Sequence, residues 1–249
     1  MNRIAKGFDF LSGVYDLMSG VAFAGTIGRA QRHFLREIPR GSRVLIVGGG
    51  TGKFIFRFLT NAEPDKVCYV EISKAMMNQA KANFMRINDR DGKVPHWHLG
   101  ELNSLPDLGT FDVAITYFYL DLFDPATLKD EMRGISERLK PSGTWIFADF
   151  RRPVRFPMRL VANGMIKLMY LIFRMICSIP ASGLPYFLVT FMQSGWEAAN
   201  QKRFAFGMIE AILFKRKFKQ PLNSYDHDIT NYSVGQHKGP DFSEVHLQL

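Results

Sequence analysis

"VLIVGGGTGKFIF", residues 44–56, joins an apolar, β-branched run to a loop with four glycines and then to a second apolar run. Such a passage predicts a buried strand, a tight turn and the start of a helix. Glycine has no side chain, so the backbone at these positions can come close to a bound nucleotide or nucleoside. The stretch therefore predicts a ligand site, and it leaves the kind of ligand open.

Two familiar loop types fit this stretch poorly. A triphosphate-binding loop would need glycine where Val47 stands and a hydroxyl residue where Phe54 stands. The dinucleotide fingerprint is matched by Gly48 and Gly50, but Lys53 occupies the position of its third glycine. None of the eight tyrosines has a lysine four positions later, as a short-chain dehydrogenase would require. A nucleotide-dependent oxidoreductase therefore stays open only as a less favoured function.

Short β-branched runs alternate with longer amphipathic runs from residue 43 to residue 150. We expect strands within 43–47, 66–72, 94–99, 111–120 and 143–150, with helices at 51–59, 73–85 and 125–140. Ser73 is expected to cap the second helix, and Pro141 with Gly143 to end the third. This order predicts an α/β, Rossmann-like, doubly wound, mostly parallel sheet with an antiparallel C-terminal strand. Residues 202–217 are expected to form that strand or a pair of strands. Its ligand crevice would lie at the carboxyl ends of the strands.

Three regions are expected along the chain. Residues 1–42 are predicted to form an N-terminal helical lid, and residues 43–217 the main domain. That domain includes a basic, apolar, helical insert at about 151–195. Residues 218–249 form a polar tail without a clear period.

Charge and cysteine content indicate the kind of partner and the cellular compartment of the protein. The net charge of +9 predicts attraction to an anionic partner, and no Asp or Glu occurs from residue 150 to residue 196. Cys68 and Cys177 are far apart in apolar surroundings, which favours a reducing compartment over a disulfide framework. The first twenty residues lack the continuous apolar core of a secretory signal. We expect a cytoplasmic protein with peripheral contact to an anionic membrane.

The motifs taken together resemble the class I S-adenosylmethionine-dependent methyltransferases. VLIVGGGTG is similar to the first motif of that family, often "VLDVGCGTG". Four further segments match in order: YVEISKAMM, LGELNSLP, FDVAITYFYL and ERLKPSGTWIFADF. The resemblance covers roughly residues 10–217 and implies S-adenosyl-L-methionine as the cofactor. Many members carry an acidic residue where Ile46 stands, so a carboxylate that would help order the loop is expected to be missing.

The resemblance assigns roles to particular residues. Gly48, Gly50 and Gly52 would let the backbone approach the methionine part of the cofactor. Glu71 would accept hydrogen bonds from both ribose hydroxyls. Glu101 would accept one from the adenine amino group, with Ile72 and Leu102 beside the ring.

The molecule that would accept the methyl group is predicted less directly than the cofactor. The candidate catalytic residues are Tyr117, Asp121 and Tyr15, of which Tyr15 would close over the site from the N-terminal helices. The insert and "FDFLSGVYD" are loosely similar to the ubiquinone and menaquinone biosynthesis methyltransferases, which favours a lipophilic, quinone-like or lipid-like acceptor. A specific nucleic-acid substrate is not expected, because YFYLDLFDP replaces the Asn/Asp-Pro-Pro-aromatic loop of amino-directed methylases.

His96 and His98 share a strand face without a third ligand nearby, so no metal site is predicted. Ile46, together with the lack of a clear base, keeps open a second hypothesis, a non-catalytic binding protein with the methyltransferase fold.

Overall fold

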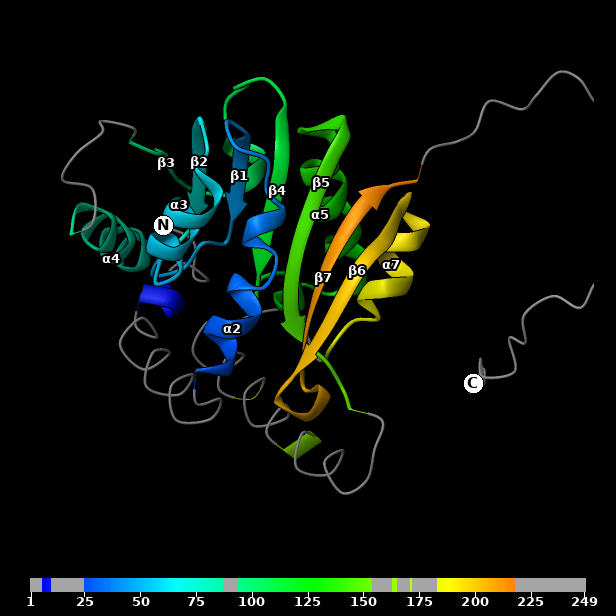
Figure 1. The fold of residues 1–249 in the computed structure, drawn as a ribbon. Helices are drawn as coiled ribbons and strands as arrows, with labels where there is room; N and C mark the ends of the chain where they lie inside the picture. The colour runs from blue at the N-terminus through cyan, green and yellow to red at the C-terminus, as the bar shows by residue number, and fades with distance from the viewer. Residues whose placement is uncertain are drawn as a thin grey trace, which may run out of the picture. The chain divides into compact units, whose positions relative to one another are not determined.

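The computed structural model describes residues 6–9, 25–86, 94–153, 163–164, 171 and 183–217. Its centre is a seven-stranded sheet with the order β3-β2-β1-β4-β5-β7-β6 (Figure 1). Tyr15, most of the insert and the tail at 218–249 lie outside the described residues. The sequence-based fold class is confirmed by this sheet and by the helices on both of its faces.

The five strands from β3 to β5 are parallel. They are β1 (Arg43–Val47), β2 (Lys66–Glu71), β3 (His96–Leu99), β4 (Phe111–Tyr117) and β5 (Leu139–Phe150). The C-terminal part contributes a pair of strands. Strand β7 (Ile209–Arg216) runs antiparallel to β5, and β6 (Trp196–Phe204) runs antiparallel to β7. The short turn η4 (Ala205–Gly207) joins them.

Helices cover both faces because the strands alternate apolar side chains between them. Val44 and Ile46 of β1 belong to one core cluster, and Leu45 and Val47 to the other. The first cluster is shared with helices α2 (Thr26–Arg32), α3 (Ile55–Ala62) and α4 (Lys74–Met85), and with η1 (Leu35–Glu37). The second is shared with α5 (Pro125–Glu137) and α7 (Phe187–Gln193). Figure 1 shows α2 on one side of the sheet and α5 on the other.

The sequence predicted the ends of some helices correctly and of others wrongly. The predicted cap is confirmed, because the Ser73 hydroxyl oxygen accepts a hydrogen bond from the Met76 amide at 3.1 Å. Helix α3 begins at Ile55 rather than at residue 51, because the glycine loop runs on through Gly52 at a φ of 68°.

The prediction that Pro141 and Gly143 end the preceding helix is wrong. Helix α5 ends at Glu137, and both residues lie inside β5. The pairing of β4 with β5 shifts register between Phe111 and Val113, so the start of β5 tolerates a proline. A Cβ at Gly143 would lie 2.8 Å from the Lys140 carbonyl oxygen, which explains a glycine at this irregularity.

Candidate active site

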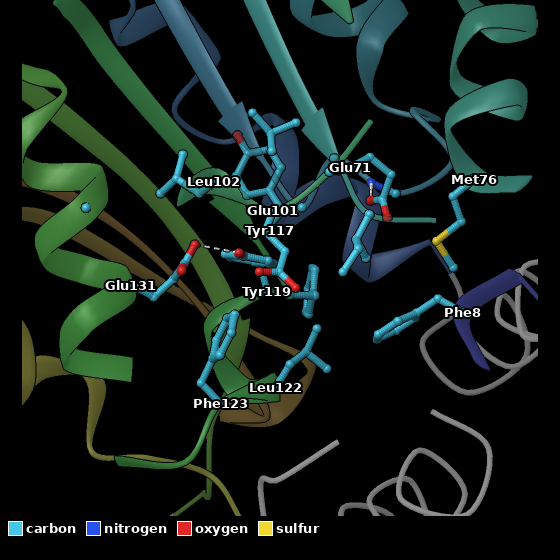
Figure 2. A pocket seen from close by; sticks show the side chains of 18 of the residues that line it. Phe8, Glu71, Met76, Glu101, Leu102, Tyr117, Tyr119, Leu122, Phe123 and Glu131 are labelled. Atoms are coloured by element: carbon cyan, nitrogen blue, oxygen red, sulfur yellow. Dashed lines mark hydrogen bonds between the residues drawn. The ribbon is translucent and has the colours of Figure 1, made fainter. Parts of the chain in front are cut away.

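A cavity of about 790 Å³ opens at the carboxyl ends of β1, β2 and β4 (Figure 2). Its lining also includes residues from α5, from α2 and from the helical turn at 6–9. All seven residues that the resemblance assigned to the cofactor line this one cavity: Gly48, Gly50, Gly52, Glu71, Ile72, Glu101 and Leu102. Residues spread over 55 positions of sequence are thus brought together by the parallel sheet.

Three glycines of the loop adopt a backbone conformation that favours glycine. The φ angles of Gly48, Gly50 and Gly52 are 65°, 61° and 68°. A Cβ at Gly48 would lie 2.1 Å from Cδ2 of Tyr119, so that position is closed to any side chain. A Cβ at Gly50 would meet nothing within 4 Å, although Gly50 lines the cavity. Space for a ligand is therefore present directly against the Gly50 backbone.

Neighbouring elements hold this loop in place. The Gly50 amide donates to Glu71 Oε2 at 2.8 Å, and the Tyr69 hydroxyl donates to the Gly50 carbonyl at 3.1 Å. Asn83 on α4 donates to the Thr51 carbonyl at 2.8 Å. Position 46 itself carries no carboxylate, as expected, and the carboxylate that contacts the loop is Glu71 of β2.

Glu71 is a buried carboxylate, 5% exposed, that accepts hydrogen bonds from backbone amides. Burial raises its pKa, and the amides of Ser73, Gly50 and Ile72 oppose this rise. A carboxylate has about four acceptor positions, so these amides leave room for a hydroxyl from the cavity. They also reduce the capacity for the two ribose hydroxyls expected from the resemblance. The residues present thus fit a nucleoside with at least one ribose contact at Glu71.

The turn that carries Glu101 and Leu102 is fixed from two sides. His98 Nε2 lies 2.9 Å from Ser104 Oγ and 3.2 Å from the Glu101 carbonyl oxygen. Because the Ser104 hydroxyl itself donates to the Glu101 carbonyl, His98 Nε2 is best placed as a donor to both oxygens. From α5, Arg138 donates to the Leu102 carbonyl at 3.2 Å. The backbone of the two residues that the resemblance assigns to adenine is therefore held in place.

Aromatic side chains after β4 form another wall of the cavity. Tyr119 donates its hydroxyl to Glu131 Oε1 at 2.6 Å, as Figure 2 shows, and burial raises the pKa of both groups. Tyr117 also lines the cavity, but its hydroxyl donates to the Gln31 carbonyl at 2.6 Å, and burial raises its pKa. The Tyr117 hydroxyl is thus occupied in holding the end of α2. Its catalytic role stays a prediction.

Asp121, the second catalytic candidate, lies beside another buried acid rather than in the cavity wall. It is 2% exposed, and its amide donates to Asp149 Oδ2 at 3.3 Å. Burial raises the pKa of Asp121 to about 7. The pKa of Asp149 is raised well above its usual range by burial first and by the Asp121 charge second. The role of Asp121 as a base, like that of Tyr15, stays a prediction.

Several residues of the site were missed by sequence reasoning. Tyr69 had a usable signal, since it stands two positions before Glu71 and so shares its strand face. Asn83, Glu131 and Phe8 had none, because each reaches the site from a helix whose position depends on the sheet.

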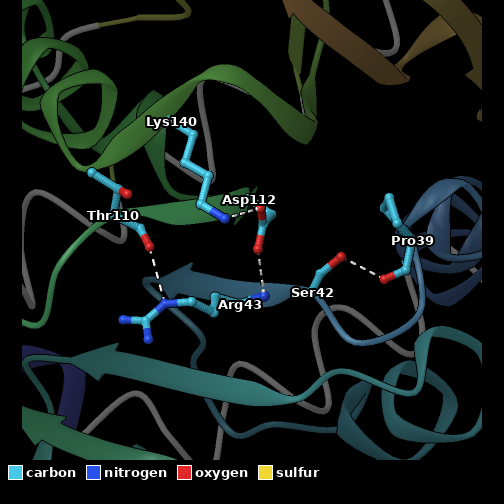
Figure 3. A network of polar contacts seen from close by, with 6 residues as sticks. All are labelled: Pro39, Ser42, Arg43, Thr110, Asp112 and Lys140. Carbon is cyan, nitrogen blue, oxygen red and sulfur yellow. Dashed lines mark hydrogen bonds and ion pairs between the residues drawn. The ribbon is translucent and has the colours of Figure 1, made fainter.

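A second polar network lies at the amino ends of the strands (Figure 3). Asp112 accepts a hydrogen bond from the Arg43 amide at 2.9 Å and forms an ion pair with Lys140 at 2.6 Å. The Arg43 side chain donates to the Thr110 carbonyl at 3.0 Å. Nearby, the Ser42 hydroxyl donates to the Pro39 carbonyl. These contacts join β1, β4 and β5 at the edge opposite the cavity, so their role is to fix strand register.

Comparison with known proteins agrees with this architecture. Residues 45–145 match the family model described as "Methyltransferase domain". The chain is 28% identical over 169 residues to the ubiquinone/menaquinone biosynthesis C-methyltransferase UbiE of Pasteurella multocida, covering 64% of this chain and 60% of that protein. The UbiE protein of Azotobacter vinelandii is 30% identical over 158 residues, covering 61% and 60%. The chain thus spans about 60% of the length of these curated relatives.

Solved structures share the fold at low sequence identity. An O-methyltransferase family protein from Burkholderia thailandensis superposes with a TM-score of 0.62 at 14% identity, over 82% of this chain and 59% of that one. The 1,6-didemethyltoxoflavin-N1-methyltransferase of the same organism, solved with S-adenosylhomocysteine, gives 0.59 at 15% identity, over 84% and 86%.

The sheet order, the glycine loop and these superpositions define a Rossmann-like methyltransferase fold. Residues 45–145 match a methyltransferase domain, and the chain is similar in sequence to UbiE methyltransferases over about 60% of their length. These matches agree with the resemblance to the class I S-adenosylmethionine-dependent methyltransferases and support S-adenosyl-L-methionine as the cofactor.

Proposed function

We propose that this chain transfers a methyl group from S-adenosyl-L-methionine to a lipophilic small molecule, quinone-like or lipid-like. The observation that carries the proposal is that the glycine loop, Glu71 and Glu101 line one cavity together with an aromatic and apolar wall. The relatives named for ubiquinone and menaquinone biosynthesis support a quinone-like acceptor.

The cavity offers the two environments that such a reaction needs. When bound, the cofactor supplies a methyl group on a cationic sulfonium, which is transferred by in-line displacement. Glu71 and Glu101 provide polar contacts for a nucleoside. Apolar surface for a lipophilic acceptor comes from Ile27, Phe54 and Leu122. Holding donor and acceptor in line and excluding water supply much of the rate enhancement for this kind of transfer. If the acceptor must lose a proton, Tyr117 and Asp121 are the candidate groups within the described chain.

Donor binding is tested by calorimetric titration with S-adenosylmethionine and S-adenosylhomocysteine, with NADH and FAD as controls. We expect micromolar binding of the methionine compounds alone, equivalent to about −8 kcal/mol. Glu71→Ala should weaken it, because both the ribose contact and the hydrogen bond to the Gly50 amide are lost.

Gly50→Arg should abolish binding by filling the space against the loop. Gly41→Arg is the matched control, since Gly41 also has a positive φ, of 74°, and nothing within 4 Å of a Cβ, but it does not line the cavity. Equal losses in both variants would show that backbone strain, and not the ligand space, was being measured.

Methyl transfer is tested with labelled donor and lipophilic quinols. Labelled product in the wild type and none in Gly50→Arg is the expected outcome. Donor binding without turnover on any acceptor would favour the second hypothesis, a non-catalytic binding protein. Binding of NADH or FAD instead would favour the oxidoreductase.

Contact with an anionic membrane is a further part of the proposal. Helix α7, in the described part of the basic, apolar insert, exposes Val189 and Met192 by 51% and 61%, and Tyr186 just before it by 81%. Within the described residues, no helix has the length and apolar character needed to span a bilayer. Co-sedimentation with phosphatidylglycerol vesicles, lost in Val189→Asp/Met192→Asp and absent with neutral vesicles, is expected. Equal recovery of both proteins with the vesicles would contradict it.

A further inference from the structure

A contact far apart in sequence ties residues 6–9 to the amino end of α4. Asp9 Oδ1 accepts a hydrogen bond from the Ser73 hydroxyl at 2.6 Å and another from the Ala75 amide at 2.9 Å. The Ser73 oxygen in turn accepts from the Met76 amide. The first turn of α4 is therefore capped both by its own serine and by an aspartate from the N-terminal segment. A carboxylate at this end of a helix also interacts favourably with the helix dipole.

This contact is continuous with the donor end of the cavity. The Ser73 amide donates to Glu71 Oε1 at 2.8 Å, and Glu71 Oε2 accepts from the Gly50 amide at 2.8 Å. A chain of hydrogen bonds thus runs from Asp9 through Ser73 and Glu71 to the glycine loop. Ser73 is 0% exposed and Glu71 is 5% exposed, so water competes little with these bonds.

Phe8, the neighbour of Asp9, lines the cavity. Figure 2 shows its side chain on the same side of the cavity as Met76, away from Glu131. Because Phe8 and Asp9 belong to one helical turn, the hydrogen bonds that fix Asp9 also fix where Phe8 stands.

We propose that Asp9 is a positioning residue that latches the helical turn at 6–9 onto α4, so that Phe8 completes the donor end of the cavity and donor binding is coupled to this latch. The inference rests on the proposed function, because the ligand it concerns is the methionine cofactor. It extends that function by assigning a specific anchor and a specific wall residue to the N-terminal segment.

The test combines two readouts on the full chain. Titration calorimetry with S-adenosylhomocysteine compares the wild type with Asp9→Ala, Phe8→Ala and the double variant. Hydrogen exchange of the peptide containing Ala75 is followed without ligand. Asp9→Asn is the conservative variant, because its amide oxygen can still accept both hydrogen bonds. Glu37→Ala, an exposed acid on η1 outside the cavity, is the control.

We expect Asp9→Ala to raise the Kd about tenfold and to speed exchange of the Ala75 amide, while Asp9→Asn and Glu37→Ala stay near the wild type. The Kd of the double variant for S-adenosylhomocysteine should be no higher than that of the single variant that binds more weakly, because Asp9 acts through Phe8. Unchanged exchange in Asp9→Ala would refute the latch. Faster exchange with an unchanged Kd would refute the coupling. No binding by the wild type would instead refute the proposed function and with it the coupling, while exchange would still report on the latch.

Discussion

The buried pair Asp121 and Asp149 makes the stability of this fold depend on pH in an unusual direction. Both side chains are at most 2% exposed, and the pKa of Asp121 is raised by burial to about 7. A carboxyl whose folded pKa lies above its unfolded value stabilises the fold fully below the unfolded pKa, near 4. That contribution is lost as the pH rises through the folded pKa. The protein should therefore lose stability between about pH 4 and pH 7.

The size of the effect follows from linkage. A pKa about three above the ordinary value of an aspartate corresponds to roughly 4 kcal/mol over the whole interval. Between pH 5 and pH 8, about 3 kcal/mol of this should be seen. Asp121→Asn removes this ionisation while keeping a side chain of similar shape, so its free energy of unfolding should decline less steeply over the same range.

The assay is urea unfolding followed by tryptophan fluorescence at pH 5, 6, 7 and 8. Asp130→Asn is the control, because the Asp130 side chain is 69% exposed and pairs with Arg133 on the same helix. It should follow the wild-type curve. A change in packing would shift the whole Asp121→Asn curve by a constant amount, so the slopes of the two curves are compared and not their heights. Equal slopes from pH 5 to pH 8, with or without such a shift, would refute the reasoning.

Three further predictions concern the cavity wall. Gly48→Ala should lose at least tenfold in donor affinity, because its Cβ would lie 2.1 Å from Tyr119. Gly109→Ala, with a φ of 74° and an ordinary contact of 3.6 Å to the Arg43 side chain, should cost only backbone strain of roughly 1 kcal/mol. Equal behaviour of the two variants in calorimetry and thermal melting would contradict this. Tyr119→Phe should lower the free energy of unfolding by about 1–3 kcal/mol, because Glu131 loses its donor in a largely buried position, and chemical denaturation measures it. His98→Ala should weaken donor binding several-fold, because it releases the turn that carries Glu101. Calorimetry compares it with His96→Ala, at an exposed histidine on the same strand. Equal donor affinity in the two variants would count against the role of His98.

Much of the site could be anticipated because its parts stand at strand ends. Glu71 and Glu101 each follow an apolar run, and parallel strands bring their carboxyl ends to one edge of a sheet. What could not be anticipated is which partners these groups find there. Glu71 of β2 accepts a hydrogen bond from the Gly50 amide in the glycine loop. The Tyr117 hydroxyl, expected near the chemistry, is bound to the end of α2.

The sequence by itself determined the order of strands and helices, the parallel core and the ligand loop, because these follow from hydrophobic period and glycine placement over short distances. Only the tertiary structure decided the contacts between segments far apart. Asp9 meets Ser73 across 64 positions, and Asp121 meets Asp149 across 28. Such pairs leave no local pattern, because each depends on how helices and strand ends pack together. The burial that shifts the pKa of these acids likewise exists only once the sheet and its helices have assembled.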